Sequence, residues 1–145
     1  MYRLLILDDD FAIRLLYKLE LTDEEYLVFD TDDCKNIMDI IDQKMPDLVI
    51  LDIKMGQFNG RNILRKIRNK YYDMPVILCS AYDIFKHDLK SIAADFYVTK
   101  SSDLRRLKSV IKMALESQDQ DAKNLFWECQ ERYPVVSDET EVDIS

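Results

Sequence analysis

Short apolar runs alternate along most of this chain with longer segments whose apolar residues recur at three- and four-residue steps. Five runs have the length of strands buried on both faces, where continuous hydrophobicity replaces apolar–polar alternation. They lie at 4–7, 27–29, 48–51, 76–79 and 96–98. Helices are expected at about 11–21, 34–43, 60–70, 85–93 and 103–116. Five strand–helix repeats predict an α/β fold, with a parallel sheet, helices on both faces and right-handed crossovers.

The length and the charge distribution predict one domain followed by an acidic tail. The chain has 145 residues and a formal charge of −8. Residues 117–145 hold eight acids and two bases, which leaves only −2 for residues 1–116. We therefore expect a domain at 1–116 and a tail at 117–145, with a helix at about 121–133 and a disordered end. The acidic balance argues against direct nucleic-acid binding.

The cysteines and the apolar runs indicate in which compartment of the cell the protein is found. Cys34, Cys79 and Cys129 are an odd number without CxxC or metal-ligand spacing, so we expect reduced packing residues. No apolar run is long enough to cross a bilayer, and the N-terminus lacks the pattern of a signal peptide. The prediction is a cytoplasmic protein without membrane insertion.

Polar side chains follow four of the predicted strands at the point where each strand ends. Asp8 and Asp9 follow the first strand, Asp52 ends the third, Ser80 ends the fourth, and Lys100 lies just past the fifth. The carboxyl ends of parallel strands meet at one edge, where open α/β sheets bind their ligands. The sequence therefore predicts one site built from these side chains.

The residue types at this edge indicate phosphoryl chemistry. Close carboxylates repel one another and need a cation, and oxygen ligands without His or Cys favour Mg²⁺ or Mn²⁺. A carboxylate can attack phosphorus and become an acyl phosphate, and Asp52 is the best candidate. Lys100 supplies a positive charge, and Ser80 a hydroxyl donor. Each residue also has a purely structural reading: the acids at 8–10 as a helix cap, and the others as loop, turn and surface residues.

Taken together, these residues resemble the receiver domain of two-component response regulators across about 2–116. The matching residues are the acids Asp8, Asp9 and Asp10, the stretch 46–55 with Asp52, then Gly60, the stretch 75–81 with Ser80, and the stretch 96–100 with Tyr97 and Lys100. The resemblance implies a flavodoxin-like three-layer sandwich with five helices and strand order 2-1-3-4-5, here followed by a short C-terminal helical extension.

The resemblance also implies a function. A histidine kinase or a histidine phosphotransfer protein would transfer a phosphoryl group to Asp52, and the altered surface would select a downstream protein or a homodimer. Such a phosphoacceptor promotes its own phosphorylation and dephosphorylation and is not a turnover enzyme. Asp9 and Asp52 would ligate Mg²⁺ directly, Asp8 largely through water, and Lys54 through its backbone carbonyl.

Further roles carry over by position. Ser80 and Tyr97 match the switch pair, in which the hydroxyl moves toward the phosphoryl group and the ring turns inward. Lys54 and Tyr82 match side chains that border the phosphoryl group and tune its hydrolysis. We expect a bulky Tyr82 to shield the acyl phosphate from water.

The chain departs from the family pattern at three positions. Gly56 and Ser101 replace usual prolines, and Ala93 replaces a common helix-ending glycine. The family commonly has a cis peptide after the active-site lysine, and without proline a cis bond costs ~3 kcal/mol or more. Either the Lys100–Ser101 bond is cis, or Lys100 approaches with altered geometry.

Two other readings stay open at this point. The first is a phosphate-independent pseudo-receiver scaffold, which the complete set of pocket residues disfavours. The second is an aspartate-nucleophile phosphatase of the haloacid dehalogenase type. Such an enzyme usually needs a second aspartate two residues after the nucleophile, where this chain has Lys54.

Overall fold

The computed structural model describes residues 1–55, 58–81 and 95–116, with only the backbone of Lys54 and Met55. Several expectations fall outside these residues: the helix at about 85–93, the tuning residue Tyr82, the departures at Gly56 and Ala93, and the tail at 117–145 with its helix at about 121–133. None of the helices within the described ranges is long and apolar enough to span a bilayer.

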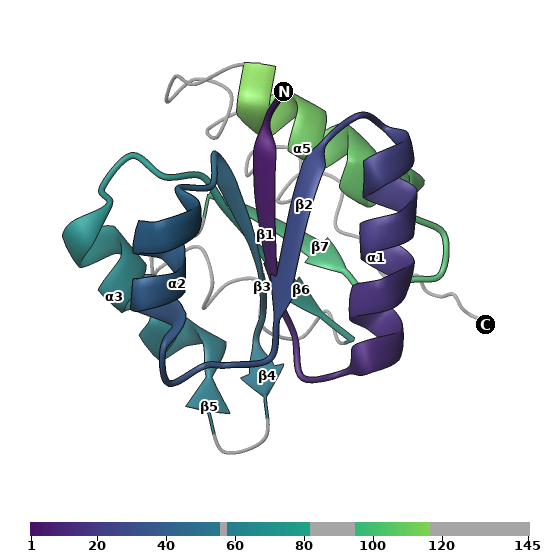
Figure 1. Cartoon of the computed structure of the whole chain (residues 1–145). Helices are drawn as coiled ribbons and strands as arrows, with labels where there is room; N and C mark the ends of the chain where they lie inside the picture. The colour runs from purple at the N-terminus through teal and green to yellow at the C-terminus, as the bar shows by residue number, and fades with distance from the viewer. Residues whose placement is uncertain (56–57, 82–94, 117–145) are drawn as a thin grey trace, which may run out of the picture.

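Five parallel strands form the central sheet (Figure 1). The strands are β1 (Arg3–Leu7), β2 (Leu27–Thr31), β3 (Leu48–Asp52), β6 (Val76–Ser80) and β7 (Phe96–Thr99). Their spatial order is β2-β1-β3-β6-β7, which confirms the predicted 2-1-3-4-5 order of a flavodoxin-like fold. All five residues of β3 and of β6 are buried, as expected for central strands covered on both faces.

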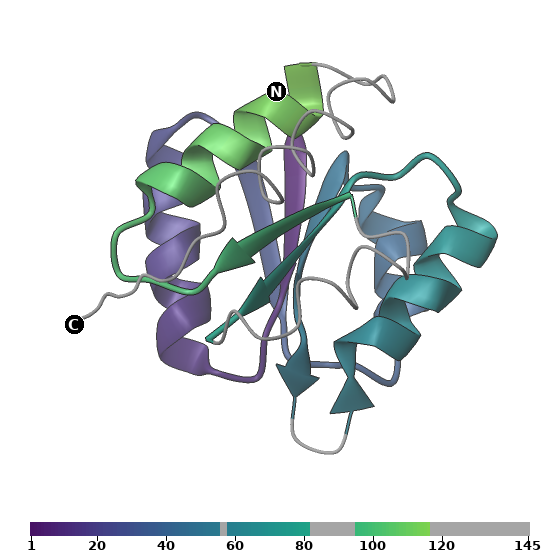
Figure 2. The ribbon, with the colours of Figure 1, turned by 180° about the vertical axis from the view of Figure 1, so that it is seen from behind.

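Helices cover both faces of the sheet. Helices α1 (Phe11–Asp23) and α5 (Arg105–Glu116) lie on one face, and α2 (Ile37–Lys44) and α3 (Gly60–Lys70) on the other (Figures 1 and 2). Four of the five expected helices thus lie in the described part of the chain. Each buries one apolar stripe: α3 buries Ile63, Leu64 and Ile67, at the spacing of an amphipathic helix.

Helix α2 begins three residues later than the sequence pattern predicts. The Asp33 carboxylate accepts hydrogen bonds from the backbone and side-chain N–H groups of Asn36, at 3.1 and 2.9 Å. A side chain that bonds the backbone in this way favours a turn over a helix. Helix α2 therefore starts at Ile37, and it ends before Met45, which has a φ of 48°.

A small hairpin follows β3 where the sequence pattern indicates only a loop. Its strands are β4 (Lys54–Met55) and β5 (Phe58–Asn59), which pair antiparallel. Two-residue strands are too short to produce a hydrophobic period, which explains why the pattern did not predict them. Next to the hairpin, the Gly60 N–H donates to the Ile53 carbonyl at 2.8 Å, so α3 starts directly beside the end of β3.

Candidate functional site

The Lys100 ammonium lies between two buried carboxylates at the carboxyl edge of the sheet. Its Nζ is 2.9 Å from an Asp8 oxygen and 3.0 Å from an Asp52 oxygen. Asp8 follows β1, Asp52 ends β3 and Lys100 follows β7, so three separate strands deliver the groups. The Lys100 N–H also donates to the Ser80 carbonyl at 2.7 Å, which fixes Lys100 beside the end of β6.

Asp9 joins Asp8 and Asp52 in an acidic cluster. One carboxylate oxygen from each lies within 4.8 Å of the others, and Asp9 is the exposed member. Three carboxylates against a single ammonium leave excess negative charge in a partly buried pocket. The donors are all oxygens, and among the described residues no His or Cys joins the cluster, so the set fits a hard divalent cation such as Mg²⁺ or Mn²⁺.

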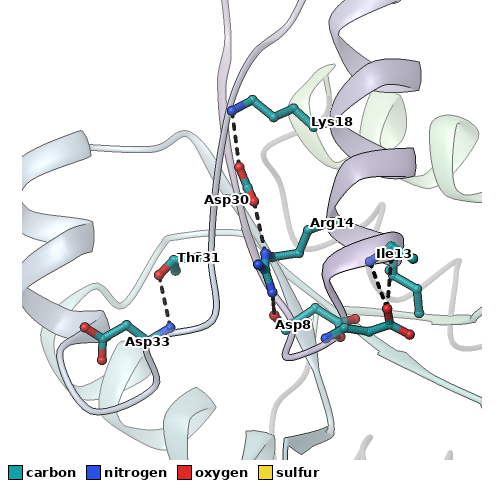
Figure 3. A network of polar contacts seen from close by, with 9 residues as sticks. Asp8, Ile13, Arg14, Lys18, Asp30, Thr31 and Asp33 are labelled. Carbon is teal, nitrogen blue, oxygen red and sulfur yellow. Dashed lines mark hydrogen bonds and ion pairs between the residues drawn. The ribbon is translucent and has the colours of Figure 1, made fainter.

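The third acid of the run, Asp10, has a different role from Asp8 and Asp9. Its carboxylate accepts the N–H groups of Ala12 and Ile13, at 2.9 and 3.4 Å, and so caps α1; Figure 3 shows the bond to Ile13. The Asp10 N–H in turn donates to the second Asp8 oxygen at 2.9 Å. The helix-cap reading therefore holds for Asp10, whereas Asp8 and Asp9 belong to the acidic cluster.

The peptide bond between Lys100 and Ser101 is trans, since no cis bond occurs among the described residues. The ammonium nevertheless contacts both carboxylates. The Ser101 hydroxyl accepts the Asp103 N–H at 3.0 Å, and Asp103 in turn accepts the Arg105 N–H at the start of α5. Without a proline after it, Lys100 thus reaches both carboxylates across a trans bond, and a turn bonded by the Ser101 hydroxyl follows.

Ser80 and Tyr97 are both buried on neighbouring strands. Ser80 is opposite Thr99 in the register of β6 and β7, and Tyr97 lies two residues before Thr99. Because residues two apart on a strand point to the same face, Ser80 and Tyr97 share one face of the sheet. Of Lys54, only the backbone position in β4 is described, so its predicted carbonyl ligand and its tuning role stay predictions.

The electrostatics of the pocket act on the groups around it. Burial disfavours the charged form of Lys100, but hydrogen bonds to Asp8 and Asp52 and their negative charges outweigh it, so the pKa of Lys100 is raised. Cys79 lies opposite Asp52 in the register of β3 and β6, and its thiol is buried. Its burial raises its pKa to about 12, against the attraction of Lys100 and with the help of both carboxylates.

Tyr17 on α1 is a buried residue near the site that the sequence analysis did not single out. Burial and the neighbouring Cys79, Asp8 and Asp52 raise the pKa of its phenol, so the hydroxyl stays neutral. In the sequence, Tyr17 is one of the apolar residues expected on the buried face of α1, where an aromatic residue indicates packing only. Tyr17 and Cys79 are therefore buried neutral groups close enough to Asp8 and Asp52 to feel their charges.

Comparison with known proteins gives one consistent result. The family model of the response regulator receiver domain matches residues 4–112. The response regulator TrrA from Thermotoga maritima, in a structure with Mg²⁺ and BeF, is 38% identical, with a TM-score of 0.72 over 77% of this chain and 97% of that one. TrrA bound to the histidine kinase ThkA matches at 37% identity, with a TM-score of 0.73 over 79% of this chain and 99% of the matched chain.

A CheY-like receiver domain from Methanospirillum hungatei matches with a TM-score of 0.75 at 28% identity, over 83% of this chain and 98% of that one. The family model covers most of the chain, and the matched structures share its fold. The chain belongs to the family of response regulator receiver domains of two-component systems.

Proposed function

We propose that this chain is a phosphorylation-dependent signalling switch in which Asp52 accepts a phosphoryl group from a histidine kinase or a phosphotransfer protein. The observation that carries the proposal is the placement of Lys100 within 3.0 Å of Asp52 and Asp8, beside Asp9. Asp8, Asp9 and Asp52, with the backbone carbonyl of Lys54, would hold Mg²⁺ there. When bound, Mg²⁺ supplies positive charge for the phosphoryl oxygens.

The residues of the chain then have distinct chemical roles. A carboxylate oxygen of Asp52 attacks phosphorus, the new O–P bond forms, and the N–P bond to the donor histidine breaks, with its electron pair leaving on the imidazole. Lys100 turns from its carboxylate partners toward the transferred group and neutralises its oxygens. Ser80, at the end of the adjacent strand, donates its hydroxyl to another of these oxygens.

The output follows from the shared face of Ser80 and Tyr97. Once the hydroxyl is drawn to the phosphoryl group, the population of the Tyr97 ring shifts toward the inward position, which the buried ring also occupies in this structure. The surface near β7 and α5 then changes for a downstream protein or a second copy. The phosphoryl group returns to water from the same pocket. We therefore expect a switch that promotes its own phosphorylation and dephosphorylation, without turnover of other substrates.

A protein donor needs a surface beside the pocket, and α1 offers one. Phe11, Leu15 and Leu19 are exposed to 66, 46 and 60%, although each is large and apolar. Their four-residue spacing places them on one side of the helix. Helix α1 begins directly after Asp10, so this apolar stripe starts at the rim of the pocket. The stripe supports docking of a phosphodonor protein; in the related structure, TrrA is bound to the kinase ThkA.

The test is formation of a beryllofluoride complex, read by ¹⁹F NMR, together with the mass gain after incubation with acetyl phosphate and Mg²⁺. We expect both signals in the wild type and neither in Asp52→Asn or without Mg²⁺. Asp42→Asn is the matched control, because Asp42 lies on α2 away from the cluster, and it should behave as the wild type. A wild-type protein that gives neither signal would contradict the proposal and favour the phosphate-independent scaffold. Release of phosphate from phosphomonoesters would favour the phosphatase.

A further inference from the structure

Arg14 on α1 joins the first acidic turn to the edge strand β2. Its Nη1 donates to the Asp8 backbone carbonyl at 2.8 Å, and its Nε donates to the Asp30 carboxylate at 3.0 Å (Figure 3). The Arg14 side chain is only 12% exposed. One largely buried guanidinium thus contacts both the strand beside the site and the backbone of a residue in the site.

The contact matters because Asp8 sits where β1 gives way to the turn before α1. On one side of this residue, the Asp8 N–H donates to the Thr31 carbonyl at 3.2 Å. On the other side, its carbonyl accepts the hydrogen bond from Arg14. Both backbone groups of Asp8 are therefore bonded to groups outside the turn, one on β2 and one on α1.

We infer that Arg14, oriented by Asp30, is a positioning residue that holds the Asp8–Asp9 turn in the geometry needed to bind a divalent cation. The inference rests on the proposed function for the identity of that cation. Arg14 touches neither the phosphoryl group nor the metal and acts only through the backbone of Asp8. The sequence alone gives no sign of this role, because Arg14 and Asp30 lie sixteen residues apart and meet only in the folded sheet.

The planar fork of arginine suits this role, because two of its N–H groups bond two acceptors in fixed directions. Lysine has one compact ammonium and cannot bridge the same pair in that way. Lys18 provides the internal comparison: its Nζ lies 3.2 Å from the other Asp30 oxygen, but its side chain is 48% exposed. Among the contacts described for Lys18, none reaches the acidic turn.

Charge and positioning make opposite predictions for Arg14. A cation near a Mg²⁺ site repels the ion, so removing the charge alone tightens Mg²⁺ binding. If Arg14 positions the turn, its removal weakens binding, because the carboxylates no longer converge. The loss of such a supporting contact typically costs about tenfold or more in metal affinity. The sign of the change therefore separates the two explanations.

The experiment measures the Mg²⁺ dissociation constant of the full chain by calorimetry, with the melting temperature in EDTA recorded for each variant. We expect Arg14→Met to raise the dissociation constant about tenfold. Arg14→Lys, which keeps the charge, should weaken binding in the same direction. Lys18→Met is the matched control, because it also removes one positively charged partner of Asp30. It should leave the Mg²⁺ dissociation constant within about twofold, because solvent screens the charge of Lys18.

The outcomes are distinguishable. Equal or tighter Mg²⁺ binding by Arg14→Met, or wild-type binding by Arg14→Lys, would overturn the inference. If Arg14→Met does not fold, Arg14→Lys decides the question alone. A wild-type protein that binds no Mg²⁺ would instead overturn the proposed function.

Discussion

Gly60 packs directly against the backbone of Asp52. A Cβ atom at residue 60 would lie 2.3 Å from the Asp52 carbonyl oxygen and 2.9 Å from the Cα of Ile53. Both are backbone atoms of the segment that carries Asp52, the proposed phosphoacceptor, so neither can rotate away. The absence of a side chain at Gly60 therefore sets how closely α3 approaches the end of β3.

Replacement of Gly60 by alanine should destabilise the fold by about 1–3 kcal/mol, because overpacking forces the backbone to shift. The shift acts on Asp52, so beryllofluoride binding should weaken as well. Urea unfolding measures the first effect, and ¹⁹F NMR the second. Lys66→Ala, at an exposed position of the same helix, should change the free energy of unfolding by less than about 0.5 kcal/mol. Equal stability of both variants would contradict this account of Gly60.

The acids at 8–10 should separate in their effects. Asp9→Ala should abolish most Mg²⁺ binding, while the stability in EDTA rises slightly because one of three repelling carboxylates is gone. Asp10→Ala should bind Mg²⁺ normally, because its backbone N–H still reaches Asp8, but lose about 1 kcal/mol of stability with the cap.

Asp10→Ser keeps an oxygen that can cap α1 and serves as the control, with stability close to that of the wild type. Calorimetry with Mg²⁺ and urea unfolding in EDTA measure the two effects for all three variants. If Asp10→Ala weakened Mg²⁺ binding as strongly as Asp9→Ala, the division of roles would be wrong.

The buried thiol of Cys79 should make stability depend on alkaline pH. Its pKa is about 12 in the folded protein and about 8.5 when unfolded. Because the folded pKa is the higher one, the stabilisation is complete below about pH 8.5 and is lost as the pH rises toward 12. By pH 10 the loss should be about 2 kcal/mol.

Cys79→Ala removes this titration and leaves that of Tyr17 and Lys100 in place. The free energy of unfolding, measured under reducing conditions from pH 7 to 10, should therefore fall less steeply in the variant than in the wild type. Parallel curves would show that the thiol is not shielded in the folded state.

The exposed apolar residues of α1, Phe11, Leu15 and Leu19, should matter for a protein phosphodonor but not for a small-molecule phosphodonor. Leu15→Asp should slow phosphorylation by the cognate kinase at least about tenfold, because a charge in a docking surface must be desolvated. Phosphorylation by acetyl phosphate should be unchanged, because Asp52 is untouched. Met113→Asp is the control, because it places the same charge at an exposed apolar residue of another helix, α5, where Met113 is 38% exposed. Equal slowing with both donors would place the effect in the pocket rather than in docking.

The fold was predictable because parallel strands produce continuous apolar runs, and the run at 48–51 corresponds to a strand buried along its whole length. Asp8, Asp52 and Lys100 were predictable because strand ends converge at one edge. The separate role of Asp10 was not predictable. An aspartate that caps a helix and one that binds a metal have the same side chain, and they differ only in the direction in which it points. The Arg14–Asp30 contact was equally invisible, since it depends on the lateral placement of β2 against α1.

The buried Asp95 shows the same limit at the opposite edge of the sheet. Its carboxylate accepts the Val76 N–H at 2.7 Å and pairs with Arg68 of α3, so it fastens the beginnings of β6 and β7 to that helix. A charge in front of an apolar run indicates only a strand boundary in the sequence. Its partners come from two other elements, which no local pattern identifies.

The order of the site groups along the chain has a practical consequence. The three clustered acids all precede residue 53, whereas Ser80 and Lys100 follow the connection at 71–75 between α3 and β6. A cut in that connection would leave one fragment with the carboxylates and another with the ammonium, and neither fragment alone would hold a finished pocket. Co-expressed halves that reassembled would regain beryllofluoride binding only on joining, because that ligand needs both the carboxylates and Lys100, which would make this domain a natural starting point for a split reporter.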